Sequence, residues 1–117
     1  MSLIVSYEVT ENVLIVRLVG ELDHHEAEQL REEWAHKIYA TGIKHIIVNL
    51  QDLTFMDSSG LGVLIGRYKE VLQLGGEMLV CHVNPFIERL FELSGLFKIV
   101  RLAENEKQAL HTLGVAS

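Results

Sequence analysis

The chain has 117 residues, 49% of them hydrophobic and 22% charged, a balance typical of one globular domain (residues 1–117), which excludes a disordered protein. Its net charge is −6 and it has no basic cluster, so we expect no direct binding to nucleic acid. The longest apolar runs are too short to span a membrane, and the first residues do not resemble a signal peptide, so we expect a cytoplasmic protein without membrane contact.

Two apolar runs, at 3–9 and 13–20, predict strands joined by a hairpin turn at residues 10–12. Residues 23–42 then change to helical spacing. The apolar stripe of that helix consists of Ala27, Leu30, Trp34 and Ile38. Asp23, with Glu26 three residues later, fits a capping box at the start of the helix, and Gly42 suits its end.

The short apolar run at 45–50 predicts a strand covered on both faces. A second helix follows the loop after it and ends at Gly75 and Gly76. Its expected apolar stripe consists of Leu61, Leu64, Ile65, Tyr68 and Leu72. Residues 77–83 predict another buried strand, in which the single cysteine, Cys81, is a small buried residue kept reduced.

Asn84 and Pro85 predict the N-cap and first position of a third helix, which ends at 94–95. The apolar residues of this helix are Phe86, Ile87, Leu90 and Phe91. Residues 97–102 predict a fifth strand and residues 105–113 a last small helix. The alternation of strands and helices after a leading hairpin predicts an α/β fold, with a mixed, mostly parallel sheet of about five strands and helices packed against it.

The stretch FMDSSGLG at 55–62 lies between a buried strand and a helix, where open α/β sheets place their functional sites. A phosphate cradle is disfavoured because the glycines are spaced one residue too far apart for the dinucleotide fingerprint and no Lys-Ser/Thr pair follows. A catalytic serine is disfavoured because the glycine of a nucleophile elbow is missing. The adjacent His24 and His25 should point about 100° apart on a helix, so a metal site is also disfavoured.

Two interpretations of the loop then remain. Asp57, Ser58 and Ser59 are typical of a helix N-terminus, and Asp57 or Ser58 is the expected N-cap. The loop is then a helix cap and nothing more. Alternatively, one serine is a phosphate acceptor, since a helix start tolerates the added charge while a docked partner is repelled. The glycines at 60, 62 and 66 favour a functional role, because each costs about 0.8–1.0 kcal/mol of helix propensity relative to alanine.

The loop DLTFMDSSGLGVLIGRYK, together with GELDHHEAE, GGEMLV, RLFELSGLFKI and ALHTLGVAS, resembles the STAS-domain anti-sigma factor antagonists. Within that family the chain is most similar to the members that control the sporulation factor sigma-F in endospore-forming bacteria. The resemblance implies a regulator of transcription without enzymatic activity or cofactor. Unphosphorylated, it binds an anti-sigma factor that is also a serine kinase and so frees the sigma factor. Phosphorylation blocks this binding, and a PP2C-type serine phosphatase restores it.

By the same resemblance, Ser58 is the phosphoacceptor. The resemblance also implies a partner-binding set of Asp23, Asp57, Ser59, Gly60, Leu61 and Gly62. Charge and position alone do not separate Ser58 from Ser59. An alternative function is a nucleotide-binding STAS module in which Asp23 contributes to the site. We expect the free protein to be a monomer.

Overall fold

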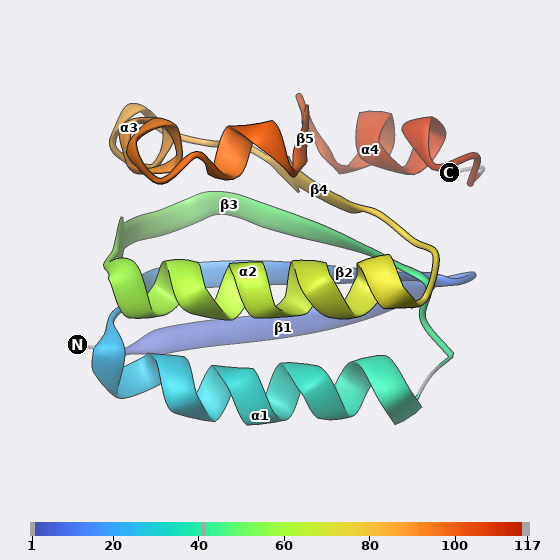
Figure 1. Cartoon of the computed structure of the whole chain (residues 1–117), viewed down its shortest axis with the longest axis horizontal. Helices are drawn as coiled ribbons and strands as arrows, with labels where there is room; N and C mark the ends of the chain where they lie inside the picture. The colour runs from blue at the N-terminus through green and yellow to red at the C-terminus, as the bar shows by residue number, and fades with distance from the viewer. Residues whose placement is uncertain (1, 41, 116–117) are drawn as a thin grey trace.

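A computed structural model describes residues 2–40 and 42–115 of the chain (Figure 1). The elements in chain order are β1 (Leu3–Thr10), β2 (Val13–Leu22), α1 (His24–Ala40), β3 (His45–Met56), α2 (Ser58–Gln73), β4 (Met78–Cys81), α3 (Pro85–Ser94), a 3₁₀ turn (Leu96–Lys98), β5 (Arg101–Ala103) and α4 (Glu106–Thr112). In these described residues no helix is long and apolar enough to cross a membrane.

The five strands form one sheet in the order β1-β2-β3-β4-β5. The hairpin pair β1 and β2 is antiparallel, and the other three pairs are parallel. Each parallel pair is joined through a helix, and right-handed crossovers that all step in one direction place their helices on one face. Helices α1, α2 and α3 accordingly share one hydrophobic core with that face. This confirms the predicted α/β fold with its mixed, mostly parallel sheet.

The last helix, α4, covers part of the opposite face of the sheet. Its Ala109 and Leu110 pack there in a second, smaller cluster with Ile47, Leu79 and Cys81. Burial is the main reason why the pKa of the Cys81 thiol is raised to about 12, and the nearby Glu106 carboxylate adds to this effect. Cys81 is therefore the buried residue that the sequence predicted.

Strand β3 is longer than the predicted strand at 45–50 and continues to Met56, so the predicted end of this strand is wrong. The apolar run is interrupted by polar residues at 51, 52 and 54, and the pairing of this part of β3 with β2 includes two register shifts. Such irregularities re-aim side chains and are frequent next to functional sites. Here they leave both Leu53 and Met56 buried, although the two residues are three positions apart.

The predicted strand at 97–102 is also largely wrong. Residues 96–98 form a 3₁₀ turn, and only residues 101–103 pair with β4. Gly95 ends α3 in the left-handed conformation, with φ of 78°, and the chain turns tightly before it reaches the sheet. The apolar residues of the predicted strand pack on the core instead: Val100 is buried in it, and Phe97 packs against it.

Two of the three predicted helix stripes need correction. The α1 stripe is confirmed, since all four of its residues are buried. In α2, however, Leu72 is 56% exposed and Val71 is fully buried in its place. In α3, Ile87 and Phe91 are buried, whereas Phe86 is half-exposed. Both helices carry more apolar residues than one face holds, so spacing alone does not select the buried set.

Candidate functional site

Three helices begin at one edge of the sheet. Each is capped by a side chain that lies within three residues of the end of the preceding strand. Asp23 precedes α1, Asp57 is the N-cap of α2 and Asn84 is the N-cap of α3. Figure 1 shows α1 and α2 starting at the end of the molecule where β3 finishes, with α3 above it. The site of interest is therefore the edge formed by the carboxyl ends of β2 and β3 and these helix starts.

The carboxylate of Asp57 joins two helices. One oxygen, Oδ1, accepts hydrogen bonds from the backbone N–H groups of Ser59, at 2.9 Å, and Gly60, at 3.1 Å. The other oxygen, Oδ2, accepts from the backbone N–H of His24, the first residue of α1, at 3.0 Å. Of the two expected N-caps the structure thus selects Asp57, and it also ties the start of α1 to the start of α2.

Asp23 caps α1 itself. Its Oδ1 accepts from the backbone N–H groups of His25, at 3.0 Å, and Glu26, at 3.2 Å. Partial desolvation raises the pKa of the Asp23 carboxyl, but these two N–H groups outweigh it, with help from the neighbouring histidines, and leave the pKa below its usual value. Asp23 therefore stays ionised and adds negative charge beside Asp57.

The two histidines lie over this junction. The Nδ1 atom of His24 is 3.7 Å from Oδ2 of Asp57, and the rings of His24 and His25 are 4.0 Å apart. The expectation that the two side chains point apart is wrong, because the two rings are in contact although consecutive helical residues start about 100° apart. Within the described part of the chain no group of three or more His, Cys, Asp or Glu residues is arranged to hold a metal ion.

Ser58 occupies the first position of α2 and is exposed. Among the described residues, its hydroxyl has no hydrogen-bond partner. A nucleophile of a Ser-His-Asp triad needs a base within hydrogen-bonding distance, and His24 is instead placed against Asp57. A free hydroxyl at a helix start is accessible to an incoming enzyme.

The other predicted site residues divide into exposed and buried ones. Ser59 is partly exposed and Gly62 is exposed. Leu61 is only 7% exposed and belongs to the main core. Gly60 is buried, and a Cβ there would lie 2.8 Å from side-chain carbons of Leu22 and Met56, so close packing on the sheet requires this glycine. A Cβ on Gly62 or Gly66 would meet nothing, so packing within the chain explains neither.

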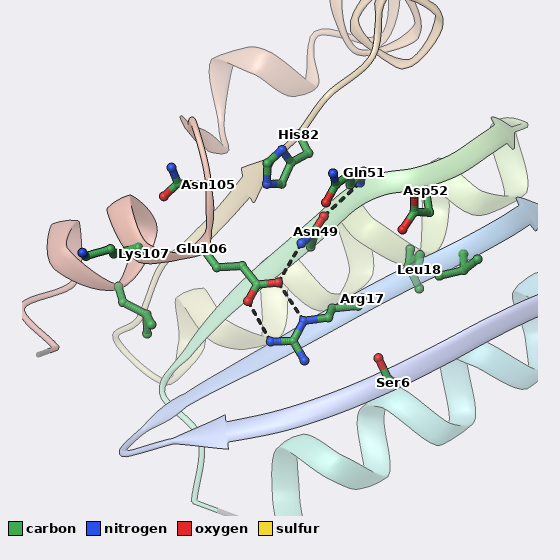
Figure 2. Close-up of a pocket in the computed structure, with 12 residues that line it drawn as sticks. Ser6, Arg17, Leu18, Asn49, Gln51, Asp52, His82, Asn105, Glu106 and Lys107 are labelled. Atoms are coloured by element: carbon green, nitrogen blue, oxygen red, sulfur yellow. Dashed lines mark hydrogen bonds and ion pairs between the residues drawn. The ribbon is translucent and has the colours of Figure 1, made fainter. Parts of the chain in front are cut away.

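A polar pocket of about 800 Å³ lies elsewhere, on the face of the sheet that α4 partly covers (Figure 2). Figure 2 shows Arg17 and Asn49 pointing at Glu106 across it, and both donate hydrogen bonds to that carboxylate at 2.7 Å. A smaller pocket of about 230 Å³ lies between β1 and α1 and is lined by Glu26 and Glu33. Neither pocket includes Asp23 or Ser58, so neither supports a nucleotide site built on Asp23.

Two connections at this edge were not predicted from the sequence. The first is the bond between Asp57 and α1, which spans 33 positions and has no local signal. The second is Asn84, whose Oδ1 caps α3 as predicted while its Nδ2 donates to the carbonyl of Leu53 at 2.9 Å. An Asn at an N-cap is the only signal for this second bond, since its amide retains a free donor.

Comparisons with known proteins agree with this architecture. Residues 5–109 match the family model described as the STAS domain. An anti-sigma F factor antagonist of Paenibacillus polymyxa is 50% identical over 117 residues, which is the full length of both chains.

Two solved structures of the anti-sigma factor antagonist SpoIIAA are also similar. The unphosphorylated form has a TM-score of 0.77 and 31% identity, covering 95% of this chain and 98% of that one. The phosphorylated form, described as a Bacillus cell fate determinant, has a TM-score of 0.75 and 34% identity, covering 94% and 99%. The fold of this chain is thus one that has been solved both with and without a phosphoryl group.

Proposed function

The chain belongs to the STAS domain family, and from that premise we propose that it is an anti-sigma factor antagonist controlled by phosphorylation of Ser58. The observation that carries the proposal is the exposed hydroxyl of Ser58, next to the N-cap Asp57; it has no hydrogen-bond partner in the part of the chain that the structure describes. Full-length identity of 50% to an anti-sigma F factor antagonist supports the choice of partner, an anti-sigma factor. The two forms of SpoIIAA, similar in fold, support the choice of modification.

The proposed switch acts at the surface and leaves the fold intact. A phosphate at the first position of α2 faces the positive end of the helix dipole, which favours the added charge. It adds roughly 1.5–2 negative charges beside Asp57 and Asp23, in a chain whose net charge is already −6. A partner docked over Ser58 is then repelled and loses contact area. Each 1.4 kcal/mol lost lowers the affinity about tenfold.

The remaining parts of the proposal come from the family resemblance. The anti-sigma factor is itself the serine kinase that uses ATP, and a PP2C-type phosphatase removes the phosphate. Through this cycle the chain regulates a sigma factor of sporulation. In the predicted set, the exposed Gly62 and the partly exposed Ser59 and Asp23 contact the partner. Gly60 and Leu61 support that surface from below, since they are buried.

The first test is the site of phosphorylation. The purified protein is incubated with ATP and the anti-sigma F factor of Paenibacillus polymyxa, followed by intact mass measurement and peptide mapping. We expect one added phosphate on the wild type and on Ser59→Ala, and none on Ser58→Ala. The P. polymyxa antagonist serves as the positive control for kinase activity. A phosphate elsewhere, or none while this control is modified, contradicts the proposal.

The second test is binding of the same anti-sigma factor, measured by calorimetry. Wild type and Ser58→Ala should bind similarly, and Ser58→Asp should bind at least about tenfold more weakly. Helical circular dichroism should be unchanged in Ser58→Asp, because an acid at the first turn of a helix is favourable. Normal binding by Ser58→Asp would leave the loop with a capping role only.

A further inference from the structure

We propose that Phe55 and Phe86 form the apolar anchor of the surface on which the anti-sigma factor docks; this rests on the function proposed above. The two rings are 6.0 Å apart and nearly parallel, with an interplanar angle of 23°. Phe55 is nevertheless 38% exposed and Phe86 50% exposed. The pair comes from two elements, the end of β3 and the first turn of α3, and neither residue belongs to the main core.

The aromatic pair adjoins the Ser58 loop. Phe55 precedes Ser58 by three positions, which limits their Cα separation to roughly 10 Å. Phe86 is held at the same edge because Asn84, two residues before it, caps α3 and donates to the Leu53 carbonyl of β3. The pair therefore lies at the same edge of the sheet as the phosphoacceptor, on the side toward α3.

The Ser58 loop alone is too small for a stable docking surface, so residues beside it must also contact the partner. A stable interface buries about 800 Å² on each partner. The loop itself offers few exposed side chains, since Gly60 and Leu61 are buried and Gly62 has no side chain. On its α1 side the loop is flanked by Asp23 and the two histidines, which are polar.

On its α3 side the loop is flanked by the aromatic pair. Aromatic side chains are enriched in the cores of interfaces and among the residues that dominate binding energy. The occupant is thus the same anti-sigma factor. It must present an apolar pocket to Phe55 and Phe86 beside the point where it covers Ser58. A phosphate on Ser58 then weakens the partner's contact with the Ser58 loop and its contact with the aromatic pair together.

The test compares truncations of two exposed apolar side chains on one helix. Phe86→Ala is expected to weaken binding of the P. polymyxa anti-sigma F factor about tenfold or more in calorimetry. Leu93→Ala is the matched control, because Leu93 is 71% exposed on α3 but seven residues further from the helix start, and its affinity should stay within about twofold. Phe55→Ala, on a different element, should lose affinity as Phe86→Ala does.

The outcomes separate this inference from the function on which it rests. If wild type binds and Ser58→Asp does not, while both phenylalanine variants bind like wild type, the aromatic anchor is wrong and the switch stands. If Leu93→Ala loses as much affinity as Phe86→Ala, the anchor is likewise wrong, because the loss follows α3 as a whole. If wild type does not bind while the P. polymyxa antagonist does, both proposals fail.

Discussion

At the scale of single residues, Asp57 does more than a helix cap usually does. A typical N-cap satisfies orphan N–H groups of one helix, whereas this carboxylate accepts from the first turns of both α1 and α2. Its own N–H donates to the Leu22 carbonyl at 3.3 Å, which fixes the residue to the end of β2. Asp57 thereby holds the Asp23 segment and the Ser58 segment in one surface.

Substitution of Asp57 should separate its two connections. We expect Asp57→Ala to lower the free energy of unfolding by about 1–3 kcal/mol, since it removes a cap and a bond to a second helix. Asp57→Asn keeps an acceptor for α2 but turns an N–H₂ group toward the His24 N–H, so its loss should be intermediate. Urea unfolding measures both.

The neighbouring Ser58→Ala is the matched control for these variants. Because Ser58 is not the cap, its change should stay within about 0.5 kcal/mol. If Ser58→Ala destabilises as much as Asp57→Ala, the assignment of the cap is wrong.

At the scale of elements, α1 shows how completely a helix is specified when its apolar residues fit one face. Ala27, Leu30, Trp34 and Ile38 recur at helical spacing, and all four are buried. Trp34 is fully buried, and its indole N–H has no hydrogen-bond partner among the described residues. The contribution of Trp34 therefore comes from packing rather than from its polar group.

Truncation of Trp34 tests this role. Trp34→Ala should cost about 3–5 kcal/mol of unfolding free energy, because it opens a large cavity between α1 and the sheet. Trp34→Phe should cost clearly less, since it keeps an aromatic ring and removes a buried, unsatisfied donor. His36→Ala, at an exposed position of the same helix, is the control in chemical denaturation. A small effect of Trp34→Ala would contradict the packing described here.

At the scale of the whole molecule, one charged cluster fastens α4 to the sheet face opposite the other helices. The Arg17 side chain of β2 donates two hydrogen bonds to Glu106 of α4, and Asn49 of β3 donates a third (Figure 2). The hydrogen bonds from Arg17 hold the pKa of the Glu106 carboxyl below its usual value; desolvation opposes this, and Asn49 adds to the lowering. The cluster thus stabilises the ionised form of Glu106.

The lowered pKa predicts a pH-dependent contribution. A carboxyl whose pKa is lower in the folded than in the unfolded chain stabilises the fold above the unfolded value, 4.5, and loses this effect as the pH falls through the folded value. Glu106→Gln should therefore cost about 1–2 kcal/mol at neutral pH, and this cost should shrink steadily as the pH falls below 4.5. Urea midpoints at several pH values measure the difference. Glu104→Gln, at an exposed position before α4, should show no such trend.

Local chemistry made much of this structure predictable. Helix caps and turns depend on residues within three or four positions, so Asp23, Asn84 and the glycine at 95 could be recognised from the sequence as helix ends. The serine loop was recognisable for the same reason, as a strand end followed by capping residues and glycines. What a periodic pattern did not decide was which side of an apolar helix is buried, as the exposure of Leu72 and Phe86 shows.

The sequence by itself thus determined the α/β class, the α1 face and the position of the serine loop, since each depends on neighbours within a few residues. Only the tertiary structure decided that β3 continues to Met56, that Asp57 rather than Ser58 is the cap, and that its second oxygen reaches α1. It also brought Phe55 and Phe86 together from two elements. These features depend on strand pairing and on bonds across some 30 positions, for which no local rule exists.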